Sequence, residues 1–250
     1  MTAPRLAIIG GTGLTRLKDL EITHRRVMHT PYGEPSGPLV FGRLNGIETV
    51  FLPRHGARHT IPPHQVNYRA NIWALHNTGV ETAIAVAAVG GISECMQPGR
   101  LAIPDQIIDY TWSRANTYFE GGHLEEVTHV DMTWPYCPEV RQRLLEAARE
   151  LDLPICEQGT YGATQGPRLE TAAEIDRMER DGCDLVGMTG MPETALAREL
   201  GLSYAACAVI ANRAAGRSGG EITMEEIGRN LESGMEQVKQ LLARVIATLK

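Results

Sequence analysis

Several features are scarce in this sequence. Its 250 residues contain no long apolar run, and the longest, Ala83–Val89, is far shorter than the ~20 residues that cross a bilayer. Basic side chains are outnumbered, 24 against 30 acidic ones, which gives a formal net charge of −6. Because general nucleic-acid binding needs many cationic contacts to phosphates, this balance argues against a nucleic-acid partner. It is compatible with one local basic pocket that binds a small anion.

Cysteine is also sparse, and no C-x-x-C pair occurs. The five cysteines are Cys95, Cys137, Cys156, Cys183 and Cys207. An odd number of scattered cysteines is typical of reduced cytosolic thiols and argues against a disulfide framework or a zinc site. The apolar run after Met1 is only four residues long and ends at Gly10, short of the ~7–15 residues of a secretory signal. We therefore predict a soluble, cytoplasmic protein.

Strand and helix patterns alternate along the chain, which predicts an α/β fold with a central mixed β-sheet flanked by helices. The predicted strands are Leu6–Ile9, Leu39–Leu44, Ile47–Leu52, Thr82–Val89, Leu101–Pro104, Gln106–Tyr110, Ile155–Gly162, Asp184–Met188 and Ser203–Ile210. The predicted helices are His64–Asn77, Pro138–Leu151, Glu170–Arg180, Glu193–Leu200 and Thr223–Leu249. Asn45-Gly46 predicts a hairpin turn, and Thr223 with Glu226 a capping box. No repeat or polar linker interrupts the pattern, so we expect one domain over residues 1–250.

A glycine-rich loop follows the first strand. Gly10–Gly13 can present backbone N–H groups to an anion, and Thr12 adds a hydroxyl. Arg16 stands where a dinucleotide fingerprint needs its third glycine, and no Gly-Lys-Ser/Thr follows as in a P-loop. The loop therefore predicts either an anion site or only a tight strand exit.

Other polar groups also stand where predicted strands end. Arg54 and His55 supply donors suited to phosphate, although a surface arginine beside a capping histidine would look the same. His55, His59 and His64 do not make a convincing metal site, because Gly56, Pro62 and Pro63 break any helical spacing. Further strand ends carry Ala87–Gly91, Glu170, Met188-Thr189 and Asn212. Each is weak alone, but ligands gather at the carboxyl ends of strands in α/β folds.

These strand-end residues resemble the family of trimeric purine nucleoside phosphorylases and methylthioadenosine phosphorylases. The matching stretches are Ile8–Leu14, Arg54–Gly56, Val66–Leu75, Gln97–Gly99, Gly166–Arg168, Met188-Thr189 and Pro192-Glu193. They follow one another in the family's order. The resemblance implies phosphorolysis: a purine nucleoside and phosphate yield a free purine and a sugar 1-phosphate.

The resemblance also implies which residues bind phosphate and sugar. Phosphate is expected at Thr12, Arg54, His55, Ala87, Ala88 and Thr189. A hydroxyl found at the position of Ala87 in many relatives is absent, so that contact would come from backbone N–H groups. Met188 is expected against the ribose, and His129 is expected to reach the sugar site of a neighbouring subunit in a homotrimer. Phosphate acts as co-substrate, and neither a metal nor another cofactor is expected.

The purine site implied by the resemblance is of the 6-oxopurine type. Glu170 would accept a hydrogen bond from N1–H, and Asn212 would contact N7 and O6. Adenine has no N1–H, so it would leave a buried carboxylate unpaired. The residues expected around the base are Leu169, Gly90, Arg213 and Ala214.

The group at the 5′ position points to a different branch of the family. Met224 aligns where inosine-cleaving relatives use a histidine, and we place His59 in the same pocket. A methylthio group suits the polarizable side chain of methionine. The sequence thus predicts S-methyl-5′-thioinosine as substrate, with inosine/guanosine or methylthioadenosine phosphorylases as same-class alternatives.

Two other classes remain as alternatives from the sequence. One is a nucleotide-dependent oxidoreductase, which the failed glycine fingerprint disfavours. The other is a non-catalytic nucleoside-binding protein, which would not need the predicted phosphate residues. The roles of Arg213 and Arg217 stay open, since both would either cover the pocket or belong to a solvated loop.

Overall fold

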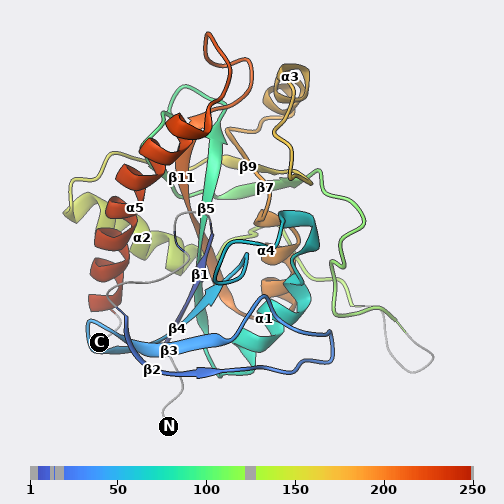
Figure 1. Ribbon diagram of the computed structural model, residues 1–250, viewed down its shortest axis with the longest axis vertical. Coiled ribbons are helices and arrows are strands. Elements are labelled where there is room, and N and C mark those ends of the chain that lie inside the picture. Colours follow the sequence, from blue (N-terminus) through green and yellow to red (C-terminus); the bar gives the residue numbers. More distant parts are fainter. Residues whose placement is uncertain (1–4, 12–13, 15–19, 122–127, 249–250) are drawn as a thin grey trace.

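Eleven strands form one mixed sheet in the described part of this computed structural model, which comprises residues 5–11, 14, 20–121 and 128–248 (Figure 1). The strands are β1 Leu6–Gly10, β2 Glu21–Arg26, β3 Leu39–Leu44, β4 Ile47–Pro53, β5 Thr82–Gly91, β6 Leu101–Ala102, β7 Gln106–Asp109, β8 Ile155–Cys156, β9 Thr160–Ala163, β10 Leu185–Gly187 and β11 Ser203–Arg213. The helices are α1 Tyr68–His76, α2 Pro138–Glu150, α3 Ala172–Arg180, α4 Gly190–Glu199 and α5 Met224–Ala247, with a 3₁₀ turn at Pro63–Gln65. The predicted fold class is confirmed.

Strand β5 is the centre of the sheet. It pairs in parallel with β1 and β11, while β4 pairs in parallel with β1. The carboxyl ends of these four strands therefore meet at one edge. The short strand β10 runs antiparallel to β5, and because its partners on β5 are Gly90 and Gly91, at the carboxyl end of that strand, it lies at the same edge.

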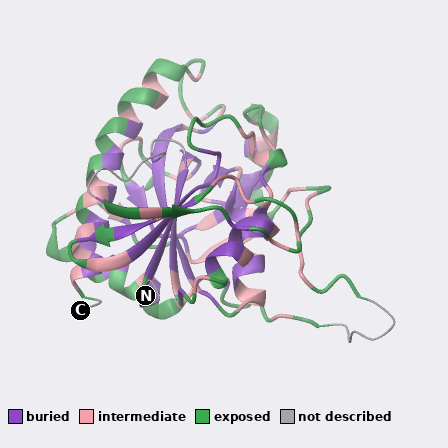
Figure 2. Cartoon of the chain, turned by 60° about the horizontal axis from the view of Figure 1, so that its bottom comes forward, coloured by how far each residue is buried: buried purple, intermediate pink, exposed green. Residues whose placement is uncertain are grey.

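Helices cover both faces of the sheet (Figure 1). The apolar sides of α2 and α5 pack on one face, with Leu144, Val238 and Leu241 fully buried. Helices α1 and α4 pack on the other, around Ile72, Leu75 and Leu196. Figure 2 shows the central strands buried between helices whose outer sides are exposed. Within the described helices, none has both the length and the apolar character needed to cross a membrane.

Local sequence signals set several turns and helix starts. Asn45 and Gly46 have φ angles of 51° and 81°, as a type I′ turn requires, and they join β3 to β4 as predicted. Helix α3 starts with a complete capping box between Thr171 and Glu174. At α5, the side chain of Thr223 accepts a hydrogen bond from the backbone N–H of Glu226.

Other elements differ from the sequence prediction. The strand predicted over Ile155–Gly162 is two strands, because β8 pairs with β6 whereas β9 pairs with β7 and β10. The helix predicted from His64 begins only at Tyr68, where the side chain of Asn67 caps it. Strand β2 was not predicted, because its residues are nearly all exposed and polar.

The prediction of free thiols is wrong for two of the five cysteines. Cys95 and Cys156 form a disulfide, with their Cα atoms 6.1 Å apart. They are separated by 61 residues, and it is the pairing of β8 with β6 that brings them together. Such a contact cannot be recognised from cysteine spacing. Cys137, Cys183 and Cys207 are free.

Candidate active site

A pocket of about 630 Å³ lies at the edge of the sheet where the strands end. The residues that follow β4, the second half of β5, the turn after β10 and the end of β11 all line it. Most of the predicted site residues are brought together here: Arg54, His55, His59, Ala87, Ala88, Gly90, Leu169, Glu170, Met188, Thr189, Asn212, Ala214 and Met224. Polar groups collected from segments far apart in the chain are typical of an active site in an α/β fold.

Arg54 is held beneath the pocket by a buried carboxylate. Its Nε and Nη2 donate to the two carboxylate oxygens of Glu193 at 2.6 and 2.7 Å, and its Nη1 donates to Val86 O at 3.0 Å. The hydroxyl of Tyr204 donates to the same carboxylate at 2.8 Å. Burial alone would lower the pKa of Arg54, but Glu193 more than offsets this and raises it. Arg54 is therefore a fixed cation in the wall of the pocket.

The glycine loop also meets Arg54. A Cβ atom at Gly11 would lie 2.6 Å from Val86 O and 2.8 Å from Arg54 Nη1. Only glycine lets the backbone pass this close to the guanidinium. This contact gives a physical reason for Gly11, whereas the predicted anion ligand Thr12 lies outside the described residues.

His55 is a neutral imidazole. Burial and the charge of Arg54 lower its pKa to about 4. Its Nδ1 lies 2.8 Å from Ile61 O, and because a carbonyl can only accept, Nδ1 carries the proton. Nε2 is then an acceptor, so a phosphate at His55 would have to present a P–OH group to it. Across the described residues, no three potential ligands cluster as a metal site would require.

The low pKa of His55 predicts a pH-dependent stability. The unfolded chain takes up this proton near pH ~6.5 and the folded chain only near pH 4, so folding is penalised as the pH falls between these values. Lowering the pH from ~7 to ~5 should cost the wild type about 2 kcal/mol at this site. Urea denaturation of His55→Gln should show a correspondingly flatter profile, whereas replacing the exposed His76 by Gln should not. Equal slopes in wild type and His55→Gln would contradict the assignment.

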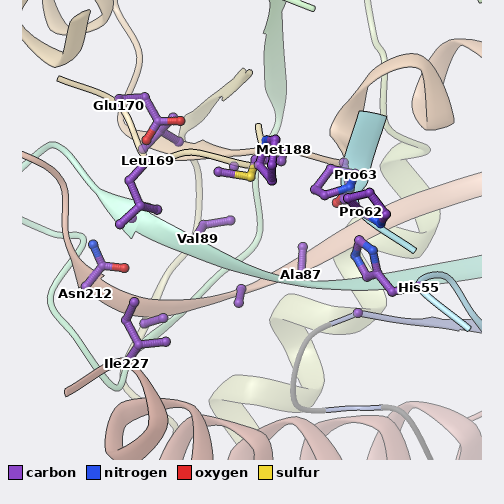
Figure 3. Close-up of a pocket in the computed structure, with 18 of the residues that line it drawn as sticks. His55, Pro62, Pro63, Ala87, Val89, Leu169, Glu170, Met188, Asn212 and Ile227 are labelled. Atoms are coloured by element: carbon purple, nitrogen blue, oxygen red, sulfur yellow. The ribbon is translucent and has the colours of Figure 1, made fainter. Parts of the chain in front are cut away.

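The opposite end of the pocket presents a carboxylate and an amide (Figure 3). Burial raises the pKa of Glu170, and the hydroxyl of Thr164 donates to its Oε1 at 2.7 Å. Asn212 follows a β-bulge, where the register between β11 and β5 shifts between Ile210 and Asn212. A bulge re-aims the side chains beside it. The Nδ2 of Asn212 donates to Arg213 O at 2.8 Å, and its oxygen points into the pocket in Figure 3.

A set of apolar side chains lines the pocket near the start of α5. Met224 is the first residue of that helix and is 76% exposed, so it lies at the mouth of the pocket. Ile227 lies one turn later, and Ile222 just before the helix. Met224 was predicted from the sequence and the two isoleucines were not, although Ile227 has the i, i+3 spacing that places it on the same side of the helix.

Two predicted site residues do not line the pocket. Arg213 points behind it and donates to Ile92 O, Ser93 O and Met96 O at 2.6 to 3.1 Å. His129 is exposed and does not belong to the residues that line the pocket. Arg217, whose role was open, forms ion pairs with Asp176 and Glu179 of α3 at 2.9 and 2.8 Å.

The buried acid of the site was also missed. Glu193 was noticed only as part of a Pro-Glu pair, and its partner Arg54 is 139 residues away. A glutamate that opens a helix is usually explained by the helix dipole. Only its complete burial distinguishes Glu193 from that ordinary case.

Comparison with known proteins agrees with this geometry. The profile of the Phosphorylase superfamily matches residues 5–247. A protein from Pseudomonas syringae pv. tomato, named probable S-methyl-5′-thioinosine phosphorylase, is 54% identical over 96% of this chain and 98% of its own. The 6-oxopurine nucleoside phosphorylase of Pyrococcus furiosus is 46% identical over 97% and 92%.

A solved structure extends the match to three dimensions. The methylthioadenosine phosphorylase of Schistosoma mansoni in complex with adenine superimposes with a TM-score of 0.94 and 33% identity, covering 98% of this chain and 92% of that one. The chain therefore belongs to the Phosphorylase superfamily. The resemblance inferred from the strand-end residues is confirmed.

Proposed function

We propose that this chain is a purine nucleoside phosphorylase that cleaves S-methyl-5′-thioinosine into hypoxanthine and 5-methylthioribose 1-phosphate, in purine salvage. The observation that carries the substrate is the composition of the pocket, which joins Glu170 and Asn212 to an apolar wall of Ile222, Met224 and Ile227. The first pair suits a 6-oxopurine, and the wall suits a methylthio group better than a hydroxyl. The likeness to the protein from Pseudomonas syringae supports the same choice.

Phosphate is proposed to bind at the part of the pocket lined by Arg54, His55, Ala87, Ala88 and Thr189, and Thr12 stays a proposed ligand on the basis of the sequence alone. Breaking the glycosidic bond builds positive charge on the sugar, and a phosphate beneath C1′ both stabilises that charge and attacks it. No side-chain nucleophile is then needed, and orientation supplies much of the rate. Inorganic phosphate is the co-substrate, and no cofactor enters the reaction.

The sugar site is proposed to be completed by a second subunit. Met188 would contact the ribose from within the chain, and His129 would reach the site of a neighbour in a homotrimer. The support is that His129 is exposed and does not line the pocket of its own chain. We also propose a cytoplasmic location. Glutathione and thioredoxin in the cytoplasm would keep Cys95 and Cys156 as reduced thiols. Activity should therefore not require the disulfide between them.

The decisive experiment compares substrates in the presence and absence of phosphate. We expect phosphate-dependent release of hypoxanthine from methylthioinosine, with kcat/KM above the values for inosine and for methylthioadenosine. Inosine as the best substrate would favour a general 6-oxopurine phosphorylase, an alternative that the likeness to the Pyrococcus enzyme supports. A large preference for methylthioadenosine would contradict the proposed base site.

Replacing Met224 should move the preference at the 5′ position. A histidine there offers a hydrogen bond to a 5′-hydroxyl and removes an apolar contact, so Met224→His should raise the inosine to methylthioinosine ratio of kcat/KM about tenfold. Met224→Leu keeps the apolar character and serves as the matched control. An unchanged ratio in Met224→His would mean that Ile222 and Ile227 form the 5′ pocket without Met224.

A further inference from the structure

Arg114 lies outside the pocket but connects two of its walls. It follows β7, and Ser113 before it has a φ of 56°, a left-handed turn residue. Its side chain reaches the loops that follow β9 and β10. It donates to four backbone carbonyls, namely Met188 O at 2.8 Å, Met191 O at 2.6 Å, Thr164 O at 3.1 Å and Gln165 O at 2.8 Å.

The rest of the guanidinium is also held in place. Its Nε donates to Gln165 Oε1 at 3.1 Å, its Nη1 approaches the hydroxyl of Tyr68 at 3.3 Å, and its carbon lies 5.3 Å from the centre of the Tyr68 ring. The ion pairs found among the described residues do not include Arg114. Carbonyl dipoles from two loops therefore converge on a cation that has no carboxylate partner there.

The loops tied by Arg114 carry groups that face the proposed substrate. Met188 lines the pocket, and Thr189 follows it directly. On the other loop, Thr164 donates its hydroxyl to Glu170 Oε1 at 2.7 Å. The guanidinium of Arg114 thus fixes the distance between two parts of the pocket. One is the Met188-Thr189 segment, at the proposed sugar and phosphate sites, and the other is the Thr164–Glu170 loop, at the proposed purine site.

A planar fork is required for this task. Arginine offers five N–H groups in one plane, whereas lysine offers three on a flexible stem. A lysine at position 114 could donate to at most three of the four carbonyls, and its flexible stem would not fix the position of one loop relative to the other. Misplacing reacting groups by about 1 Å is enough to cost roughly 100-fold in rate.

We propose that Arg114 is a positioning residue, which holds Met188-Thr189 and Thr164–Glu170 at the separation needed to align the nucleoside with phosphate. This inference rests on the proposed phosphorolysis. It assigns to Arg114 an effect on turnover, exerted through backbone carbonyls, that a residue important only for folding would not have.

Arg141 provides a matched control. It is a partly buried arginine on α2 that donates to Ile103 O, Pro104 O and Glu157 O at 2.8 to 3.1 Å, and none of these residues lines the pocket. The test measures Tm, kcat and both KM values for Arg114→Met, Arg114→Lys and Arg141→Met at a temperature where all are folded. Wild type with methylthioinosine, inosine and methylthioadenosine in phosphate is the reference.

We expect Arg114→Met to lose roughly 100-fold in kcat/KM on the best substrate, mainly in kcat, with Arg114→Lys intermediate. Arg141→Met should lower Tm about as much as Arg114→Met does, but its kcat and kcat/KM should stay within about 3-fold of the wild-type values. If the wild type is active and both Arg114 variants keep kcat/KM within about 3-fold of its value, the role proposed for Arg114 is wrong while the proposed function stands. If wild type cleaves no nucleoside, the proposed function fails and the inference with it. Arg114→Lys serves if Arg114→Met does not fold.

Discussion

Replacing Glu193 by alanine is expected to destabilise the protein by about 3–5 kcal/mol, the usual cost of removing one partner of a buried ion pair. Arg54 and Glu193 are each only 1% exposed in their side chains. Without the carboxylate, the guanidinium of Arg54 stays buried with one carbonyl acceptor, and Tyr204 loses its acceptor as well. Since a domain is stable by only about 5–15 kcal/mol, urea denaturation should show a large loss.

A surface pair with the same geometry provides the control. Arg149 binds Glu157 through Nε and Nη2 at 3.0 and 2.6 Å, as Arg54 binds Glu193, but its side chain is 53% exposed. Glu157→Ala should therefore cost less than about 1 kcal/mol. If Glu193→Ala costs no more than this, the charge of Arg54 is compensated by other groups.

A double replacement separates stability from phosphate binding. Arg54→Met with Glu193→Leu removes both charges and fills the space with apolar groups, which is often neutral or stabilising for a buried pair. We expect this variant to regain most of the stability lost in Glu193→Ala. Its KM for phosphate should nevertheless be higher than that of the wild type, because the fixed cation in the pocket wall is gone. Normal phosphate KM in the double variant would remove Arg54 from the proposed phosphate site.

Local patterns in the sequence were enough to predict the fold class and most elements. The alternation of strands and helices and the Asn45-Gly46 turn both depend on neighbouring residues. Pairing between distant segments could not be read this way. The antiparallel direction of β10 and the disulfide between Cys95 and Cys156 follow from which strands meet, and no local pattern specifies that.

The site follows the same division. Polar residues at strand ends predicted where the pocket would form, because parallel strands bring their carboxyl ends together. The arrangement behind the pocket was not predictable. Glu193 beneath Arg54 and Arg114 behind Met188 act through contacts across long stretches of chain. The bulge that aims Asn212 is likewise a property of the paired strands and not of β11 alone.

Exchanging hydrogen-bond donors and acceptors at Glu170 and Asn212, the two polar residues of the proposed purine site, should reverse the preference for 6-oxopurines over 6-aminopurines. In the proposed base site Glu170 would accept from an N1–H that adenine lacks, and the N–H of Asn212 Nδ2 that does not bind Arg213 O would donate to an oxygen at position 6. Glu170→Gln can instead donate to N1, and Asn212→Asp can accept from a 6-amino group. Each mismatched buried polar group costs about 1–3 kcal/mol, so the double variant should shift the ratio of kcat/KM toward 6-aminopurines by on the order of 10²- to 10⁴-fold.

The ionisation of Glu170 gives this prediction a second, independent measurement. Burial raises the pKa of Glu170, so its carboxylate is protonated at a higher pH than an exposed glutamate. A protonated Glu170 no longer offers both oxygens as acceptors, and kcat/KM for a 6-oxopurine nucleoside should fall as the pH drops through that pKa. Glu170→Gln has no such proton and should lose this acidic limb, while Glu157→Gln, which changes an exposed carboxylate that does not line the pocket, should keep it. An acidic limb that is unchanged in Glu170→Gln would show that the ionisation of Glu170 does not cause it, and would contradict the role proposed for Glu170 in recognising N1.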